Sequence, residues 1–287
     1  MITIIYGCGN FWHKHKEFIQ TKFDVNFICD QKLDLCEEDI YEEIPIIKTA
    51  DVFDMRNICV IICAYEANMI RQIQEQFKYP STIRFEYYRA QLSGSELLNG
   101  FPNGKYEDLC QNIIYFDDTI PNSIKIYMIG NNNCLKLGRN LSVTDELKIY
   151  MGCEADVIIG NDTTFISCEI DASWGSIHIG NDCMFSWNTF VRNDDGHHIF
   201  DMEKGERLNL CGIITIEDHC WIGQDALILK NVHIGNGSIV GARAVVTRNI
   251  GNHSIAVGNP ATVVKDGILW KRNWTKLENI KNIDMLK

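Results

Sequence analysis

The sequence predicts two domains of different fold class, an α/β domain followed by an all-β domain. Residues 1–80 alternate short apolar runs with amphipathic stretches, which is the order of a parallel sheet with helical crossovers. In residues 125–265 aliphatic side chains return every six positions, a period that fits a parallel β-helix of stacked triangular coils. Residues 81–124 show neither pattern and are interpreted as a connector, and residues 266–287 as a C-terminal tail.

The composition disfavours several classes of function. The 287 residues, 46% hydrophobic and 23% charged, suit a globular protein of one large or two modest domains. The net charge of −11, without any cluster of Lys and Arg, disfavours binding to nucleic acid. The N-terminus has no signal-peptide pattern, and no run of about 20 apolar residues predicts a membrane span. The twelve cysteines are scattered without a CxxC pair, so we expect free thiols in the cytoplasm.

The first domain has features of a Rossmann-like nucleotide fold. Its parallel strands are predicted from the apolar runs ITIIY, VNFIC and NICVIICAY, at residues 2–6, 25–29 and 57–65. Gly7 and Gly9 at the first strand-to-helix turn, and Asp30 after the second strand, lie where such a fold binds phosphates and ribose. Trp12 replaces the third glycine of the motif, which argues against hydride transfer to a dinucleotide. Binding of a nucleotide or nucleotide-sugar, and a structural, acceptor-positioning or assembly role, both remain open.

The six-residue period predicts which side chains point into the β-helix. The clearest series is Ile216, Ile222, Ile228, Ile234, Val240 and Val246. The tripeptide IGN also recurs, at Ile129, Ile159, Ile179 and Ile234. Six residues match neither the 3.6-residue turn of a helix nor simple strand alternation, and the repeated Gly and Asn disfavour a helix. Three such hexads are therefore expected to complete one coil.

The repeat is interrupted once, at a segment rich in acidic residues and histidine. Three hexads counted from Ile179 end at Gly196, and the next clear hexad begins at Ile216. Residues 197–215 are therefore expected to leave the coil as a loop. The stretch RNDDGHHIFD, residues 192–201, straddles this exit. Long loops on a rigid scaffold are common places for function.

Two adjacent histidines in this loop, His197 and His198, fit three interpretations from the residues alone. They could supply a catalytic base, ligate a metal, or belong to a solvated polar segment. Catalytic zinc requires three protein ligands with ordered spacing. His197, His198 and Asp201 do not make a convincing set, so we expect no metal.

Two runs of this domain resemble a known enzyme family. Residues 214–265, which contain the closing GNPA motif at 258–261, resemble the last coils of the left-handed β-helix (hexapeptide-repeat) acyltransferases. Residues 183–201, CMFSWNTFVRNDDGHHIFD, resemble the branch that O-acetylates capsular polysaccharide and sialic acid, whose loop pattern is approximately SDxHxIxD. The N-terminal domain is similar, more loosely, to the nucleotide-sugar-binding domain of bacterial sugar N-acetyltransferases.

The resemblance implies a transfer site with named roles. It implies that acetyl-CoA lies along the outside of the coils, between neighbouring subunits of a homotrimer. It makes His197 the general base, with Asp195 or Asp201 to orient its ring. Trp221, in the family's WIG element, is expected to pack against pantetheine or acceptor, or alternatively to fill a coil corner. A backbone N–H between Trp221 and Gly223 is the expected donor to the developing oxyanion.

A further set of residues is expected to bind acetyl-CoA. These are Gly223, Gly241, Ala242, Arg248, Asn259, Pro260 and Lys265. Gly223 and Gly241 stand 18 residues apart, hence on one edge of neighbouring coils, where absent side chains would let the pantetheine arm approach the backbone. Arg248 and Lys265 are either partners of the CoA phosphates or solvated charges.

The sequence and the resemblance together predict a cytoplasmic acetyl-CoA-dependent O-acetyltransferase that acts on a sugar hydroxyl of a bacterial surface polysaccharide or its precursor. N-acetylation of an amino sugar on a nucleotide carrier is the alternative within the same class. A non-catalytic β-helix scaffold is the alternative of another class, and it predicts no CoA bound beside His197.

Overall fold

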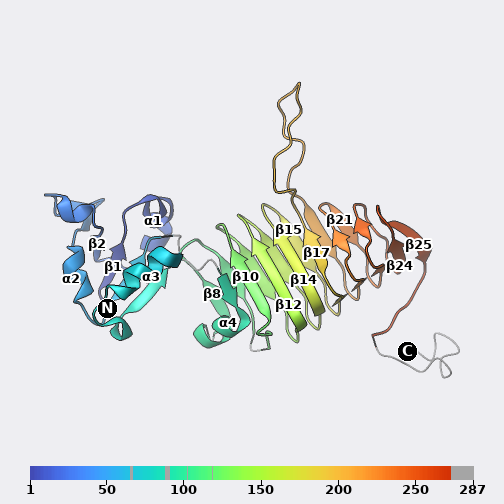
Figure 1. Cartoon of the computed structure of the whole chain (residues 1–287), viewed down its shortest axis with the longest axis horizontal. Coiled ribbons are helices and arrows are strands. Elements are labelled where there is room, and N and C mark those ends of the chain that lie inside the picture. The colour runs from blue at the N-terminus through green and yellow to red at the C-terminus, as the bar shows by residue number, and fades with distance from the viewer. Residues whose placement is uncertain (65–66, 88–90, 102, 118, 273–287) are drawn as a thin grey trace.

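The computed structural model describes residues 1–64, 67–87, 91–101, 103–117 and 119–272, so most of the predicted C-terminal tail lies outside the described residues. A small α/β domain adjoins one end of a long β-helix, and a narrow hairpin projects from the side of the helix (Figure 1). The two predicted fold classes therefore occur in the predicted order.

The N-terminal domain is built on a four-stranded parallel sheet in the order β2-β1-β5-β6. Its strands are β1 (Thr3–Tyr6), β2 (Phe27–Cys29), β5 (Cys59–Ile62) and β6 (Arg84–Tyr87). Its other elements are α1 (Asn10–Lys22), α2 (Thr49–Phe53), α3 (Ala67–Glu75), the 3-10 turns η1 (Leu33–Leu35) and η2 (Pro80–Thr82), and the pair β3 (Ile40–Tyr41) and β4 (Ile44–Pro45). The two central strands are buried at every position, which is why they read as unbroken apolar runs.

Most of the predicted connector belongs to one domain or the other. Strand β6 extends the first sheet to Tyr87, beyond the predicted boundary at residue 80. The following elements cap the start of the β-helix: β7 (Gln91–Ser93), α4 (Gly94–Gly100), β8 (Lys105–Glu107) and β9 (Ile113–Tyr115). β7 pairs with β10 (Ile124–Met128), and β9 pairs with β11 (Cys134–Leu137). The predicted start at residue 125 is therefore too late, because β9 already pairs in parallel with β11 on the first face and the antiparallel strands β7 and β8 carry no hexad.

The coil has three faces made of stacked parallel strands. The first face continues from β11 through β13 (Asp156–Ile159), β15 (Ser176–Ile179), β18 (Ile213–Ile216) and β21 (Val232–Ile234). The second contains β16 (Met184–Phe185), β19 (Trp221–Ile222), β22 (Ile239–Val240) and β24 (Ser254–Val257). The third contains β10, β17 (Thr189–Arg192), β20 (Leu227–Ile228) and β23 (Val245–Val246). The long strands β12 (Ser142–Met151) and β14 (Thr164–Ala172) run along the second and third faces, and β25 (Thr262–Asp266) turns back on β24.

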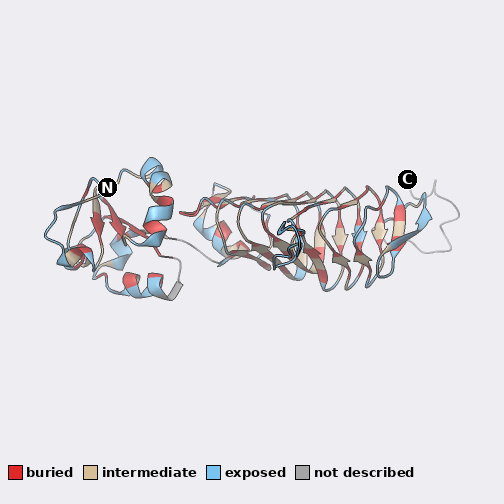
Figure 2. Ribbon diagram, turned by 90° about the horizontal axis from the view of Figure 1, so that it is seen from above, coloured by how far each residue is buried: buried red, intermediate tan, exposed pale blue. Residues whose placement is uncertain are grey.

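The six-residue period is the period of the buried, inward-pointing side chains, as predicted. Buried and exposed segments alternate along the coils of the β-helix (Figure 2). The series is buried to 1% exposure or less at Ile216, Ile222, Ile228, Ile234, Val240 and Val246. The rings of Phe165 and Phe185 stack inside the coil with centroids 4.7 Å apart. Ile129 is an exception at 69% exposed, because its neighbour Met128 takes the inward position. The IGN at residue 129 was therefore wrongly included in the repeat.

The corner between the first and second faces repeats a left-handed backbone conformation. Asp162, Asp182 and His219 occupy it in successive coils, with φ of 58°, 54° and 55°. Few residues other than glycine adopt this conformation, and Asp and His are both among those enriched in it. His219 is thus held at a tight turn two positions before Trp221, which begins a strand of the second face.

Candidate functional site

The predicted loop is a β-hairpin that leaves the corner between the third and first faces (Figure 1). It is closed at its base, where the Gly212 N–H donates to the Asn193 carbonyl (2.8 Å) and the Asn193 side chain donates to the Gly212 carbonyl (3.1 Å). The hairpin therefore spans residues 194–212, three positions earlier than the predicted 197–215. Both predicted catalytic residues of the loop, Asp195 and His197, lie within it.

Hydrogen bonds along its two arms hold the hairpin in shape. The Leu208 N–H donates to the Ile199 carbonyl and the Asp201 N–H to the Glu206 carbonyl, both at 2.8 Å. The Asp201 carboxylate accepts the N–H groups of Glu203 (2.9 Å) and Lys204 (2.8 Å) at the far turn. Asp201 is therefore the turn residue of the hairpin, and the structure does not pair it with the ring of His197.

Asp195 anchors the base of the hairpin. Its carboxylate accepts a hydrogen bond from the Asn209 amide (2.8 Å) and forms an ion pair with Lys230 of the next coil. The bonds from Lys230 and then Asn209 hold the pKa of Asp195 below its ordinary value. The structure thus gives this carboxylate partners other than the His197 ring that we expected it to orient.

The two adjacent histidines, His197 and His198, have different surroundings. The His198 ring meets the Phe200 ring edge-on, with centroids 6.2 Å apart and planes at 78°. The His197 carbonyl accepts a bond from Asn209 (2.7 Å), which fixes its backbone. Its imidazole is exposed, and no other described residue hydrogen-bonds to it. A ring that is fixed at its backbone and open at both nitrogens is suited to accept a proton from a bound substrate.

The hairpin also carries apolar side chains that nothing in the described chain covers. Five of them are more than half exposed: Ile199, Phe200, Met202, Leu208 and Leu210. In Figure 2 the hairpin is seen end-on over the coil, almost wholly exposed. An isolated two-stranded hairpin is marginal in water, and a contiguous apolar surface commonly marks a contact with another molecule.

Trp221 begins the second-face strand β19 and is 38% exposed. The backbone N–H groups of Trp221 and Gly223 donate to the carbonyls of Ser238 (2.9 Å) and Val240 (2.8 Å) in the next coil. Because coil stacking already uses both, these two groups were wrongly considered for the oxyanion. The indole N–H of Trp221 has no acceptor among the described residues. It is therefore a different candidate donor to the oxyanion.

His197 and Trp221 lie at different corners of the coil. The hairpin leaves before strand β18, whereas Trp221 follows both β18 and the next corner. The first face thus separates the two residues along the chain. No contact within the described chain joins them.

The glycines predicted to admit pantetheine have a different physical role. A Cβ at Gly223 would lie 2.7 Å from the backbone nitrogen of Ala242, and one at Gly241 would lie 2.7 Å from Val257 Cγ1. The space of the absent side chains is therefore filled by the next coil, and the prediction that these glycines admit the pantetheine arm is wrong. The other predicted CoA-binding residues are all exposed on or after the last coils: Ala242, Arg248, Asn259, Pro260 and Lys265.

The N-terminal domain has a cavity at the carboxyl edge of its sheet. Its volume is about 250 Å³, and it is lined by Tyr6, Asp30, Gln31, Met69, Gln72, Ile73 and Gln76. The Asp30 carboxylate accepts the N–H groups of Cys8 (3.0 Å) and Lys32 (2.8 Å), which ties it to the glycine turn. Trp12 is fully buried and donates its indole N–H to Glu42 (3.0 Å), so it serves the core of the domain.

A larger cavity, which sequence reasoning missed, lies on the third face of the coil. Its volume is about 450 Å³, and it is lined by Glu146, Lys148, Ser167, Cys168, Glu169, Asn188, Thr189 and Phe190. It lies next to a register shift between β12 and β14 at Val143 and Glu146. Strand β17 leads directly from this cavity to the hairpin. The cavity was missed because no local sequence pattern predicts a register shift between two strands.

Two other predictions concern thiols and metals. All twelve cysteines are free, as predicted. Within the described ranges, no three His, Cys, Asp or Glu side chains are grouped so as to hold a metal ion. Among the same residues, no helix is long and apolar enough to cross a membrane.

Comparison with known proteins assigns the β-helix to a family. The family model "Bacterial transferase hexapeptide (six repeats)" matches residues 213–248. The polysialic acid O-acetyltransferase of Escherichia coli O1:K1 / APEC is 32% identical over 139 residues, which cover 48% of this chain and 45% of that protein. The polysialic acid O-acetyltransferase of Neisseria meningitidis is 30% identical over 177 residues, covering 54% of this chain and 82% of that protein. The chain belongs to the hexapeptide-repeat acetyltransferase family.

Three solved structures of acyl- or acetyltransferases are also similar to the chain. The polySia-specific acetyltransferase NeuO matches with 26% identity and a TM-score of 0.47, covering 56% of this chain and 84% of that one. The polysialic acid O-acetyltransferase OatWY matches with 28% identity and a TM-score of 0.44, covering 55% and 83%. The Bacillus cereus N-acyltransferase AntD matches with 20% identity and a TM-score of 0.42, covering 62% and 90%. The alignment with the E. coli relative spans less than half of that protein.

Proposed function

We propose that this acetyltransferase uses acetyl-CoA to O-acetylate a sugar hydroxyl of a bacterial capsular polysaccharide or its precursor, in the cytoplasm. The observation that carries the proposal is the exposed imidazole of His197, on a hairpin at the one interruption of the hexads. The two relatives named polysialic acid O-acetyltransferases support the acceptor class.

The chemistry requires a base for a hydroxyl that is un-ionised at neutral pH. Acetyl-CoA supplies the thioester. Neutral His197 accepts the hydroxyl proton as the sugar oxygen attacks the thioester carbonyl, and then gives that proton to the departing thiolate. General base catalysis of this kind contributes on the order of 10² to 10⁴ in rate. No covalent enzyme intermediate is required.

Trp221 supplies the complementary donor. The charge that develops on the thioester carbonyl oxygen needs a hydrogen-bond donor, and the backbone N–H groups of Trp221 and Gly223 are already used. The indole N–H of Trp221 can donate while its ring lies against the pantetheine arm. Ala242, Arg248, Asn259, Pro260 and Lys265 provide the exposed surface for the rest of CoA, with the two cations toward its phosphates.

The complete site includes a second copy of the chain. Because the first face separates the hairpin from Trp221, the hairpin of one subunit is proposed to reach the coil of its neighbour. The exposed apolar side chains of the hairpin would be covered by that contact. A homotrimer closes such an arrangement with three equivalent sites.

The sugar acceptor fits the cavity on the third face. Its wall combines the carboxylates of Glu146 and Glu169 with the ring of Phe190, a mixture of polar and apolar groups suited to the hydroxyls and faces of a sugar. Strand β17 connects it to the hairpin base over a few residues, so a bound polymer would extend toward His197.

The second candidate is N-acetylation of an amino sugar carried on a nucleotide. The observation that favours it is the cavity at the carboxyl edge of the N-terminal sheet, the usual place for ligands in this class of domain. The same histidine would then deprotonate an ammonium group.

A screen of capsular oligosaccharides and nucleotide-linked amino sugars with acetyl-CoA distinguishes the two candidates. Thiol release identifies the acceptor, and mild alkali applied to the product removes an ester but leaves an amide. We expect an alkali-labile product from an oligosaccharide. An alkali-stable product on a nucleotide-linked sugar would instead establish the second candidate.

A further inference from the structure

The chain folds back over the coil after its last strand. Residues Ile268–Arg272, which we name the strap, run along the corner between the first and second faces. The Ile268 N–H donates to the carbonyl of His253 (2.9 Å), which starts the strap on the last coil. Trp270 is only 7% exposed, although it lies outside the interior of the coil. The strap is therefore fixed to the outer surface of the β-helix at this corner.

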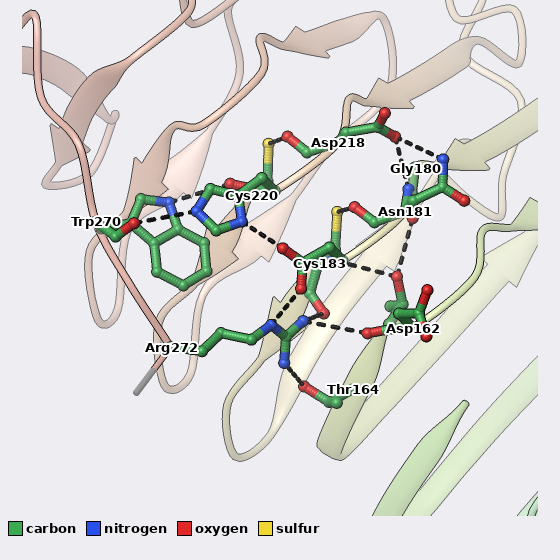
Figure 3. A network of polar contacts seen from close by, with 12 residues as sticks. Asp162, Thr164, Gly180, Asn181, Cys183, Asp218, Cys220, Trp270 and Arg272 are labelled. Atoms are coloured by element: carbon green, nitrogen blue, oxygen red, sulfur yellow. Dashed lines mark hydrogen bonds and ion pairs between the residues drawn. The ribbon is translucent and has the colours of Figure 1, made fainter. Parts of the chain in front are cut away.

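Arg272 anchors the strap to two successive coils (Figure 3). Its guanidinium donates to the Asp182 carboxylate (2.5 Å), the Cys183 carbonyl (2.6 Å) and the Thr164 hydroxyl (2.8 Å). A further bond reaches the Asp162 carbonyl at 3.3 Å. Four acceptors around a planar fork fix its position and direction.

Trp270 is held by His219, which lies on the coil that follows the two coils bound by Arg272. The two rings stack with centroids 4.0 Å apart and planes at 11°. The Trp270 indole N–H donates to the His219 carbonyl (3.0 Å), and a His219 ring nitrogen faces the Trp270 carbonyl (3.1 Å). The other ring nitrogen lies 2.6 Å from Asp182, the same carboxylate that binds Arg272. One aspartate thus links the anchor to the stacked pair.

The Trp270 ring also lies beside the ring of Trp221. The indole rings of Trp221 and Trp270 lie 5.9 Å apart and are tilted by 47°. Without Trp270, the Trp221 ring would stand on the outer surface of β19 with freedom about two side-chain torsions. The strap limits that freedom from one side.

We propose that the strap is a positioning element of the transfer site, in which Trp270 and Arg272 hold the Trp221 indole in the orientation that its N–H requires. The expected effect of the strap on kcat rests on the proposed function. The orientation of Trp221 is a property of the free protein and can be measured without any substrate. Arg272 touches the coil and not Trp221, so it acts through Trp270.

The test combines ¹⁹F NMR of protein labelled with 5-fluorotryptophan and steady-state kinetics. A Trp221→Phe variant assigns the Trp221 resonance. We expect Arg272→Gln and Trp270→Ala to shift and broaden this resonance and to lower kcat by between about tenfold and a hundredfold, because misplaced groups lose this much. KM for acetyl-CoA should change less than kcat. Arg272→Lys should restore part of both effects.

Leu269→Ala is the matched control, because Leu269 belongs to the strap but is exposed. It should leave the resonance and kcat unchanged. An unmoved Trp221 resonance in a folded Arg272→Gln protein would overturn the proposal, as would a shifted resonance with unchanged kcat. If the unaltered protein transferred acetyl to no acceptor, the proposed function would fail, while the resonance would still decide whether the strap orients Trp221.

Discussion

At the scale of single residues, the hydrogen-bond partners that the fold supplies, both distant and local in the sequence, decide what a predicted site residue does. Asp195 was expected beside His197, but Lys230, 35 positions away, pairs with it instead. Asp201 was expected in the same role, but the hairpin turn uses its carboxylate. The spacing of a motif could predict that His197 differs from His198. It could not predict that coil stacking brings Lys230 to Asp195, or that the hairpin turn uses the Asp201 carboxylate.

The ion pair of Asp195 makes a prediction about pH. Its lowered pKa means that the pair stabilises the anchored hairpin at and above the ordinary pKa of aspartate, and is lost as the pH falls through the lower, folded-state value. A Lys230→Met variant should raise the Asp195 pKa toward about 3.9, the ordinary value, in an NMR titration of its carboxyl carbon. Lys204→Met, at the far turn, should not change it. Equal titration curves for all three proteins would refute the anchoring role.

At the scale of elements, the six-residue period of the sequence predicts the repeated strands of the β-helix. It does not predict the strands that cap the β-helix or the strap that crosses its outer corner. The inward positions from Ile216 to Val246 were predicted because each coil imposes the same environment every six residues. The antiparallel strands β7 and β8 were missed because they lack that environment. The strap was missed because His219 and Trp270 meet across 51 positions with no local pattern.

Coil stacking makes a prediction about Gly223. An added Cβ would meet three backbone atoms of the next coil at 2.7–2.8 Å, none of which is a flexible side-chain end. Gly223→Ala should therefore lower the free energy of unfolding by about 1–3 kcal/mol, the usual cost of overpacking. Gly251→Ala is the matched control, since its Cβ would have only an ordinary contact at 3.7 Å. Equal denaturation midpoints for the two variants would contradict this view of the coil.

At the scale of the whole molecule, the two residues proposed for acetyl transfer, His197 and Trp221, are not in contact within the described part of one chain. The hairpin with His197 and the second face with Trp221 lie on opposite sides of the first face. A site shared between subunits predicts complementation. Mixing unfolded His197→Ala and Trp221→Ala chains and refolding them together should restore activity, because some interfaces then combine both intact residues. Each variant refolded alone should stay inactive, and an inactive mixture of folded trimers would place the site within one chain.

The central claim is that His197 is the base for acetyl transfer, and its neighbour provides the control. kcat should be measured for His197→Ala and His198→Ala with acetyl-CoA and the acceptor found by the screen. We expect His197→Ala to lose about 10² to 10⁴ in kcat, as removal of a general base does, while His198→Ala keeps nearly full turnover. Full transfer by His197→Ala, together with its loss in His198→Ala, would contradict the account.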